Sequence, residues 1–419
     1  MDRSASRRGF LKSAGAAGAA ALTAASYSRV LGANERLRIA LIGCGGRGIG
    51  AHMGGVAKVA KEQNAAVTAV VDPWRVARER AAMKAKEWFG VEARQCVSYR
   101  DVVGREDIDA VMIASCDHQH TTHLEAAARA KKDVYCEKPL SKDLPSLIRA
   151  CDAVRASQVV CQIGTQLRSL PSMTGCRALF RTGVLGKVSR IERHRNATRP
   201  YWYSRLKKVE PKDVEWAEFL CGLPDRPFNA ELFSGWYGYR EFSDGPVPGL
   251  GSHFIDLVHY ITGAKHPVSA VCHGGTFTWK DHGFTCPDHV EALWIYPEGF
   301  MVTYSTNFGN SSGNVERLYA EHGIMDLLPW GAPTVAGDGA IRKGKLGKAE
   351  PVKPVPHDDH VLDWLKCIRS RGTPNADIEA GYQHAVAVVM AMKAFDTGRR
   401  IRYDAEKRTF SEEPAGQAI

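Results

Sequence analysis

The stretch that decides the fold is Arg38-Ile39-Ala40-Leu41-Ile42-Gly43-Cys44-Gly45-Gly46-Arg47-Gly48. An apolar run typical of a buried parallel strand leads into a turn of the form G-x-G-x-x-G, and a helical pattern follows to about Lys61. In such a turn Gly43 permits the tight bend, Gly45 lets the backbone approach a pyrophosphate, and Gly48 allows close helix packing. The N-terminus of the following helix adds amide donors and a partial positive charge. The stretch therefore predicts a dinucleotide-binding fold.

Strand and helix patterns alternate from residue 34 to about residue 164. The expected strands are 38–42, 66–71, 110–114, 134–136 and 159–163, and the expected helices between them are 77–89, 123–130 and 144–156. This alternation is typical of an α/β fold with a doubly wound parallel sheet, a Rossmann domain. We assign residues 34–164 to this domain.

The pattern changes after Gly164. A helix (173–182) leads to long, often alternating strands at 188–196, 268–279, 290–296, 300–308 and 317–321, and a last apolar helix covers 379–397. We expect residues 165–419 to form an α+β domain with a large, mostly antiparallel open sheet. One face of that sheet should pack on helices and leave the other to face a partner. We assign substrate binding and oligomerisation to this domain.

The N-terminal segment has the twin-arginine form Ser6-Arg7-Arg8-Gly9-Phe10-Leu11-Lys12, followed by a weakly apolar run from Ala14 to Ala25. The run is too short and too poor in large apolar residues to form a stable membrane span. We interpret residues 1–33 as a signal peptide for the twin-arginine export machinery, which transports folded proteins. This predicts a periplasmic or otherwise exported protein. The alternative is a disordered basic tail, and Ala25 and Ala33 both remain possible cleavage points.

The composition narrows the choice of partners. The net charge of +10 is spread along 419 residues without an arginine-rich helix or arm, which argues against nucleic-acid binding. The eleven cysteines include no C-x-x-C pair, so we expect mostly free, buried thiols and no zinc site.

Asp72 ends the second expected strand, and its carboxylate bears on whether NAD or NADP binds. A carboxylate at this point bonds the adenosine ribose hydroxyls and repels a 2′-phosphate, which favours NAD over NADP. Arg75 keeps NADP open as the less favoured cofactor. The alternative is a glycine turn that only packs. The cofactor contacts that we expect are Gly43, Gly45, Arg47, Gly48, Asp72, Ser115, His120, Glu137, Lys138 and Gln166.

Three histidines follow the strand at 110–114. His118, His120 and His123 do not share one helical face, and no carboxylate pair completes a site, so we expect no metal. Cofactor contact or helix capping is the favoured interpretation.

Lys138 is the strongest catalytic candidate. Val134-Tyr135-Cys136-Glu137-Lys138-Pro139 places it at the end of a strand, on the edge where the cofactor binds. Burial would lower the pKa of its amine from about 10.4 towards working pH, so that it could take a hydroxyl proton as hydride leaves. The alternative is a surface lysine paired with Glu137. The Lys138–Pro139 bond is a candidate cis peptide.

A second polar group lies in the expected helix from Ser252 to Tyr260. At about 100° per residue, His253 and Asp256 share one face, and His259 lies on another. We take His253 and Asp256 as catalytic and substrate-binding candidates. A buried, hydrogen-bonded pair with no role in chemistry is the alternative.

Residues 200–249 are irregular and rich in aromatic rings. Flat rings such as Tyr201 and Trp236 between arginines suit a sugar-binding surface. Core filling and subunit contact explain the same residues equally well.

These motifs resemble the Gfo/Idh/MocA oxidoreductases, which are named after glucose–fructose oxidoreductase and inositol dehydrogenase. The resemblance covers nearly everything after residue 34, including Glu137-Lys138-Pro139, His253-x-x-Asp256 and Gln162-x-Gly164-x-Gln166-x-Arg168. It implies that Lys138 and His253 handle protons, that Asp256 and Arg168 contact substrate, that substrates are sugars or cyclitols, and that the chain forms dimers or tetramers.

The chain departs from the family pattern at one position. Dehydrogenase members often carry an aspartate four residues before the histidine, where this chain has Gly249. Asp256, a water or a substrate hydroxyl could replace it. The first hypothesis is an exported NAD-dependent oxidoreductase for sugars, cyclitols or glycosides. The alternatives are redox-neutral glycoside cleavage with tightly bound NAD and a ligand sensor that holds NAD without catalysis.

Overall fold

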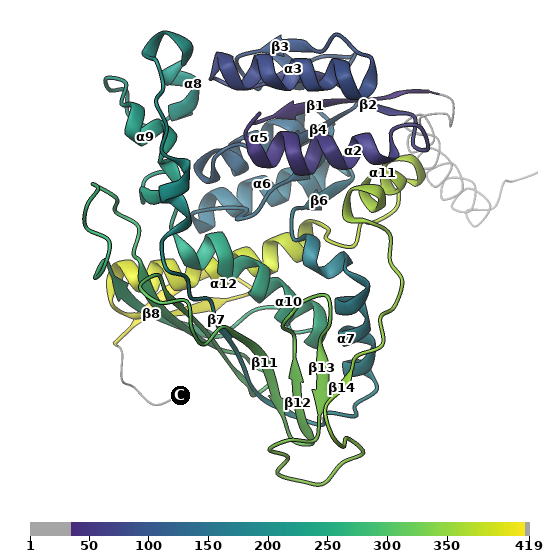
Figure 1. Ribbon diagram of the computed structural model, residues 1–419, viewed down its shortest axis with the longest axis vertical. Helices are drawn as coiled ribbons and strands as arrows, with labels where there is room; N and C mark the ends of the chain where they lie inside the picture. The colour runs from purple at the N-terminus through teal and green to yellow at the C-terminus, as the bar shows by residue number, and fades with distance from the viewer. Residues whose placement is uncertain (1–34, 415–419) are drawn as a thin grey trace, which may run out of the picture.

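The computed structural model describes residues 35–414. The predicted signal peptide, residues 1–33, lies outside the described residues. Two sheets form the framework, with helices between and around them (Figure 1). Among the described residues, no helix is both long enough and apolar enough to cross a membrane.

The first sheet has the strand order β3-β2-β1-β4-β5-β6, and every pairing in it is parallel. This is the Rossmann order, so the predicted doubly wound sheet is confirmed. The strands are β1 (Leu37–Ile42), β2 (Ala65–Val71), β3 (Arg94–Cys96), β4 (Ala110–Ile113), β5 (Asp133–Cys136) and β6 (Cys161–Ile163). Its helices are α2 (Gly54–Val59), α3 (Arg75–Phe89), α4 (Arg100–Val103), α5 (His120–Arg129) and α6 (Leu144–Ser157).

The second sheet has ten strands in the order β14-β13-β12-β11-β7-β10-β9-β8-β15-β16. Its pairings are antiparallel except for β7 with β10, as the predicted mostly antiparallel sheet requires. The strands are β7 (Val188–His194), β8 (Ser269–Gly275), β9 (His289–Ile295), β10 (Met301–Asn307), β11 (Val315–Ala320), β12 (Gly323–Asp326), β13 (Thr334–Ala336), β14 (Glu350–Pro351), β15 (Arg400–Asp404) and β16 (Thr409–Glu413).

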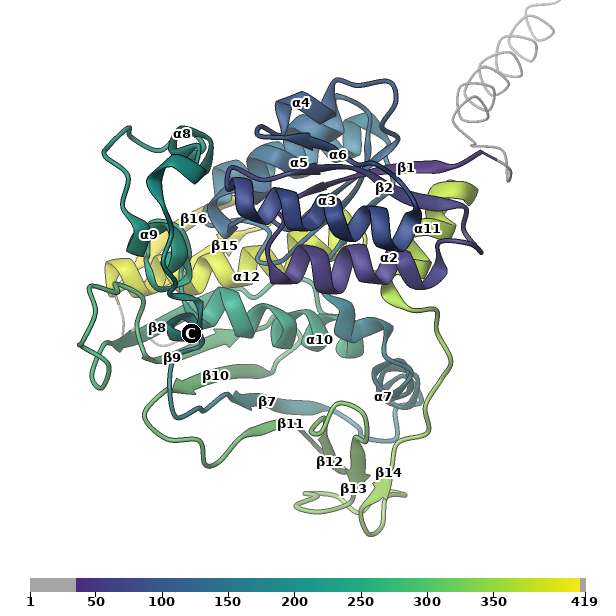
Figure 2. The ribbon, with the colours of Figure 1, turned by 45° about the horizontal axis from the view of Figure 1, so that its top comes forward.

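Helices α7 (Pro171–Arg181), α10 (Ser252–Thr262) and α12 (Ile378–Thr397) pack on one face of this sheet (Figure 2). Along β9 and β10 buried residues alternate with half-buried or exposed ones, because only one face is covered. Helix α12 packs against β8 on one side and α6 on the other, so it joins the two sheets.

Helix α11 (His360–Ser370) follows the strands of the second sheet in the chain but packs beside the first sheet (Figures 1 and 2). Val361, Trp364 and Leu365 are buried in the same apolar cluster as β1 and β2. The core of the first sheet therefore includes residues well beyond position 164.

All eleven cysteines lie among the described residues, and none forms a disulfide. Nine are buried, and Cys116 and Cys221 are half-buried. The predicted free, buried thiols are therefore confirmed.

Candidate functional site

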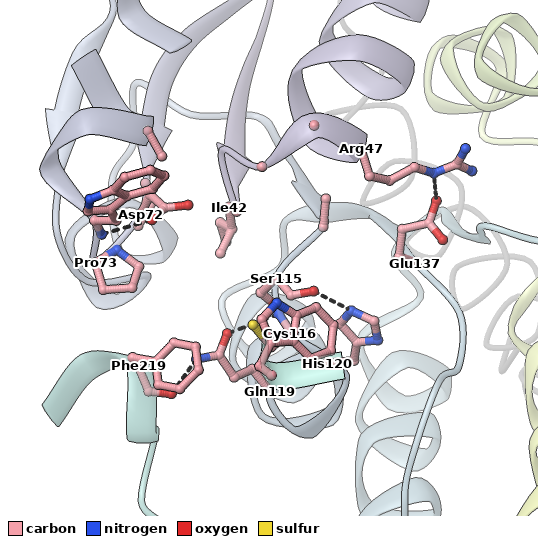
Figure 3. A pocket seen from close by; sticks show the side chains of 18 of the residues that line it. Ile42, Arg47, Asp72, Pro73, Ser115, Cys116, Gln119, His120, Glu137 and Phe219 are labelled. Atoms are coloured by element: carbon pink, nitrogen blue, oxygen red, sulfur yellow. Dashed lines mark hydrogen bonds and ion pairs between the residues drawn. The ribbon is translucent and has the colours of Figure 1, made fainter. Parts of the chain in front are cut away.

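A cavity of about 420 Å³ opens at the carboxyl edge of the first sheet (Figure 3). Its lining comes from the ends of β1, β2, β4 and β5 and from a segment between residues 205 and 253. Ligands of open α/β sheets bind at this edge, where the strand order reverses on either side of β1. Most of the predicted cofactor residues and the predicted proton-handling pair line this one cavity, whereas Gly48 and Gln166 do not.

The glycine turn has the shape that a pyrophosphate site requires. Gly43 has φ +95°, and a Cβ there would lie 2.5 Å from the backbone of Ala114. A Cβ on Gly48 would lie 2.0 Å from the carbonyl oxygen of Gly43. A Cβ on Gly45 would meet no atom within 4 Å, and this glycine lines the cavity with its backbone open to a ligand. The residues present fit the pyrophosphate of a dinucleotide.

Asp72 lies beside this turn at the end of β2. Its carboxylate accepts hydrogen bonds from the backbone amides of Cys44 (2.7 Å) and Trp74 (2.8 Å). Burial raises the pKa of Asp72, and the two amides oppose that shift. Arg75, the residue that kept NADP open, pairs with Glu79 and Asp213 and does not line the cavity. The position suits the ribose hydroxyls of NAD.

Ser115 and His120 line the cavity at the end of β4. The ring nitrogens of His120 lie 2.7 Å from the carbonyl oxygen of Pro139 and 3.0 Å from that of Ser115. The neighbouring histidines also have protein partners, since His118 contacts the carbonyl oxygen of Phe219 and His123 contacts the hydroxyl of Ser115. Within residues 35–414 no group of three or more histidine, cysteine or acidic side chains is arranged to hold a metal ion.

Glu137 lies at the centre of a charged cluster at the end of β5. Arg47 donates from Nε to its carboxylate at 2.7 Å, and His52 Nε2 lies 3.0 Å from the same oxygen (Figure 3 shows the Arg47 contact). Burial alone would raise the pKa of Glu137, but His52 and Arg47 outweigh burial and hold it well below its usual range. The carboxylate is therefore ionised next to Lys138.

Lys138 points across the cavity to the second half of the chain. Its Nζ donates to the carbonyl oxygen of Gly249 at 2.8 Å. Burial lowers the pKa of the Lys138 amine, while Glu137 and Asp117 oppose that shift. The predicted cis peptide between Lys138 and Pro139 is confirmed. Lys138 is therefore not the exposed lysine of the alternative interpretation.

His253 lies across the cavity from the glycine turn, in the first turn of α10. Burial, and then the charge of Lys138, lower the pKa of its imidazole well below the usual range. Its Nδ1 is buried and has no hydrogen-bond partner among the described residues. A neutral imidazole with a free ring nitrogen can bind a hydroxyl group of a ligand.

Asp256 and Arg168 bond to each other. Arg168 donates from Nε and Nη2 to the two carboxylate oxygens of Asp256, at 2.9 and 2.6 Å. Both side chains are buried, and neither lines the cavity. Asp256 is thus buried and hydrogen-bonded, but its partner is Arg168, a pairing that the sequence analysis did not predict.

Of the other expected contacts, some line the cavity and others do not. Trp236 lines the cavity, whereas Gln166 and Tyr201 are not among its lining residues. The hydroxyl of Tyr201 donates to the carbonyl oxygen of Gly245 at 3.3 Å, and its ring packs against Trp202, Tyr237 and Phe308.

Several lining residues were not among the expected contacts. Ten of them are Trp74, Arg80, Cys116, Gln119, Arg205, Lys207, Glu218, Phe219, Phe233 and Tyr237. Six of these ten come from the irregular aromatic stretch, whose composition indicated a functional surface but not which side chains face the ligand.

The chain is similar to a known family over both sheets. Residues 37–165 match the model described as an oxidoreductase family with an NAD-binding Rossmann fold (GFO_IDH_MocA). Residues 213–325 match the model described as the GFO/IDH/MocA C-terminal domain.

Two curated relatives are dehydrogenases of Saccharopolyspora erythraea. Inositol 2-dehydrogenase 2 is 31% identical over 299 residues, which cover 70% of this chain and 76% of the relative. Inositol 2-dehydrogenase 3 is 32% identical over 139 residues, 32% of this chain, and the match spans only 41% of that relative.

A solved structure has the same fold. The aldose-aldose oxidoreductase of Caulobacter crescentus superposes with a TM-score of 0.66 at 18% identity, covering 88% of this chain and 100% of that one. The chain therefore belongs to the Gfo/Idh/MocA family of oxidoreductases, and its first sheet is the family's NAD-binding Rossmann domain.

Proposed function

We propose that this protein is an NAD-dependent oxidoreductase that moves a hydride between nicotinamide and a hydroxyl-bearing carbon of a sugar, cyclitol or glycoside. The observation that carries the proposal is one cavity with the glycine turn and Asp72 at one end and Lys138 and His253 at the other. The relatives support the substrate class, because two are named inositol dehydrogenases and the structural neighbour is named an aldose-aldose oxidoreductase.

The chemistry that NAD brings to the site is acceptance and return of a hydride. Lys138 is the group that takes the hydroxyl proton, because burial favours its neutral amine and its side chain lines the cavity. His253 stays neutral and binds the same or a neighbouring hydroxyl through a ring nitrogen. Trp236 offers a flat ring that can cover an apolar face of a sugar.

The contrast between Asp256 and His253 refines the set of catalytic residues. Asp256 is neutralised by Arg168 within the core, so it orients α10 instead of exchanging protons with substrate. We therefore assign proton transfer to Lys138 with His253 assisting, and positioning to Asp256 and Arg168.

Two further parts of the proposal concern assembly and location. Among the described residues no helix covers one face of the second sheet, and half-buried residues such as Leu293, Met301 and Thr303 lie on it, which suits a homo-oligomer, a dimer or a tetramer. Light scattering of the purified protein tests this. The twin-arginine motif at Arg7-Arg8 supports export to the periplasm, which fractionation of cells with and without Arg7→Lys/Arg8→Lys tests.

In the main test the purified protein is mixed with a panel of cyclitols, sugars and glycosides. The absorbance of reduced nicotinamide and the released products are measured over time. Substrate-dependent reduction supports the proposal. Sustained glycoside cleavage without net reduction would replace it with the redox-neutral route, and NADH binding without any turnover would replace it with the sensor.

Lys138→Arg is the matched catalytic variant, since arginine keeps the charge and length but does not release a proton at working pH. We expect kcat to fall by about 100-fold or more, within the range of general-base effects, while NADH still binds. Lys58→Ala, at an exposed position on α2, should leave kcat unchanged. Full turnover by Lys138→Arg would contradict the assigned proton transfer.

A further inference from the structure

Residues 200–245, which we call the strap, leave the second sheet and run beside the first sheet (Figures 1 and 2). The strap contains the helices α8 (Trp216–Leu220) and α9 (Ala230–Ser234) and short 3₁₀ turns, among them Tyr201–Arg205. It joins β7 to the segment that enters α10. Its contacts with the first sheet show what it covers.

The strap is fixed to the end of β2, beside Asp72. Val214 forms an antiparallel backbone bridge with Trp74, and the amide of Glu215 donates to the carbonyl oxygen of Pro73 at 3.0 Å. Asp213 pairs with Arg75 at 2.8 Å. These contacts hold the strap over the part of the cavity where Asp72 suits a ribose.

The strap is also fixed to the end of β4, on the other side of β1. Gln119 Nε2 donates to the carbonyl oxygen of Phe219 at 2.8 Å (Figure 3), and Ser243 Oγ donates to Asp117 at 2.8 Å. Because β1 lies between β2 and β4, the strap is anchored on both sides of the glycine turn. A ligand bound at that turn lies between the first sheet and the strap.

The strap presents two cations to this space. Lys207 lines the cavity, and its Nζ lies 4.0 Å from the centre of the Trp74 ring. Arg205 lines it as well, beside Tyr237. Within residues 35–414 neither side chain forms an ion pair with a carboxylate. Arg80 adds a third cation to the same wall. Partial burial and the charges of Arg80 and Arg205 lower the pKa of the Lys207 amine, and Asp72 opposes that shift. An anionic ligand in this space offsets the repulsion among the three cations.

We propose that Arg205 and Lys207 bind the phosphate groups of NAD from the strap side and that the strap holds NAD as a resident cofactor that exchanges slowly. The inference rests on the proposed function. It adds two binding residues to the Rossmann turn, because a dinucleotide carries two negative charges and Arg47, the cation of the glycine turn, is already paired with Glu137. Release then requires the strap contacts at β2 and β4 to open, or the cofactor to pass beneath them.

The test is the rate of NADH release from the full-length protein without any sugar. Protein loaded with NADH is mixed with excess NAD, and loss of nicotinamide fluorescence gives the release rate. Lys207→Ala should speed release about tenfold, as expected for a lost charge-assisted hydrogen bond, and Arg205→Ala/Lys207→Ala should speed it further. The release rate of the double variant should depend less on salt than that of the wild type.

Lys208→Ala is the matched control, because the Lys208 side chain is 91% exposed and follows Lys207 directly. It should release NADH at the wild-type rate. Asp213→Ala, which removes a strap anchor without touching the cavity, should also speed release. Circular dichroism and unfolding of each cofactor-free variant establish that it is folded.

Two results would overturn the inference while leaving the proposed function standing. One is a release rate for Arg205→Ala/Lys207→Ala equal to that of Lys208→Ala. The other is wild-type release that is complete within the mixing time. A wild-type protein that binds no NADH at all would instead reject the proposed function itself.

Discussion

At the scale of single residues, the acceptor of Lys138 is a backbone carbonyl at a position that cannot hold a side chain. A Cβ on Gly249 would lie 2.3 Å from the hydroxyl oxygen of Tyr201 and 3.3 Å from its Cζ. The Tyr201 ring packs edge-on against Trp202, Tyr237 and Phe308, so it cannot turn aside. The Tyr201 hydroxyl thus occupies the space of the side chain that is missing at 249.

This geometry predicts a coupled pair of variants. Gly249→Ala should lower the free energy of unfolding by about 1–3 kcal/mol through overpacking and lower kcat by moving the acceptor of Lys138. In a Tyr201→Phe background the same change should cost much less, because only the 3.3 Å contact with Cζ remains. Urea unfolding of the four proteins measures the coupling. Equal costs in both backgrounds would contradict the assigned contact.

Asp117 gives a prediction about pH. Burial raises its pKa to about 6 from 3.8, while His120 and the hydroxyl of Ser243 oppose that shift. A raised folded-state pKa stabilises the fold through the protonated acid, fully below pH 3.8, and this stabilisation is lost as pH rises through about 6. Asp117→Asn removes the dependence. Relative to wild type it should gain about 1 kcal/mol of unfolding free energy between pH 5 and pH 8.

Chemical denaturation at the two pH values measures this gain, with the exposed Asp225→Asn as the control. No pH-dependent difference between Asp117→Asn and wild type would show that the carboxyl of Asp117 titrates as an exposed acid does.

The residues that the sequence located well are those whose roles depend on local backbone. Gly43, Gly48 and Asp72 are defined by a strand, a turn and the next strand end, and the structure has that turn and that strand end where the sequence predicts them. Their contacts with a cofactor stay predictions. Lys207 and Tyr237 have no such local signal. Their position at the cavity depends on strap contacts with residues 100 or more positions away in the chain, such as Gln119 with Phe219 and Ser243 with Asp117.

At the scale of elements, α10 shows how helical periodicity can place a residue on a face without identifying its partner. His253 and Asp256 are both on the inward side of α10, but His253 lines the cavity and Asp256 forms an ion pair with Arg168. Arg168 lies in the short turn Gln166–Ser169 that connects β6 to α7, far from α10 in sequence. The periodicity of α10 therefore could not separate the two roles.

The ion pair between Arg168 and Asp256 predicts that substitution of Arg168 changes the free energy of unfolding. Arg168→Ala leaves the buried Asp256 carboxylate without its partner and should lower the free energy of unfolding by about 3–5 kcal/mol. Arg168→Met/Asp256→Leu, which removes both charges, should recover much of that loss. Urea unfolding and the KM for substrate distinguish a positioning role of Arg168 from a direct contact with substrate. A folded Arg168→Ala protein with wild-type stability and a raised KM would restore Arg168 as a substrate contact.

In the second sheet the strands of six or seven residues were predicted and the shorter ones were missed. Strands β9 and β10 alternate regularly and begin and end within a residue of the expected bounds. The missed strands are β3 of the first sheet and β12, β13, β14, β15 and β16 of the second. The exposed residues of β3 and β14 carry no apolar run. Each is held by pairing with a longer neighbour, β3 by β2 and β14 by β13, which the residues of the strand itself do not encode.

At the scale of the whole molecule, the chain returns to its first sheet after it has built the second. Trp364 of α11 is fully buried, and its ring meets Tyr135 of β5 edge-on at 5.8 Å. Tyr135 lies two residues before Glu137, so the packing of α11 supports the strand that delivers Glu137 and Lys138. The alternating pattern that identified residues 34–164 gives no information about this return, because an amphipathic helix does not specify which sheet it covers.

The last prediction follows from this return of the chain. A fragment of residues 35–164 exposes the apolar surface that Val361, Trp364, Leu365 and Ile368 cover in the full protein. We expect it to unfold without a cooperative transition and to bind a hydrophobic dye. A fragment that also carries residues 357–377 behind a flexible Gly/Ser linker should unfold cooperatively, with Trp364 fluorescence reporting the docking of α11. Cooperative unfolding and NADH binding by residues 35–164 alone would mean that α11 only covers a first sheet that is already stable without it.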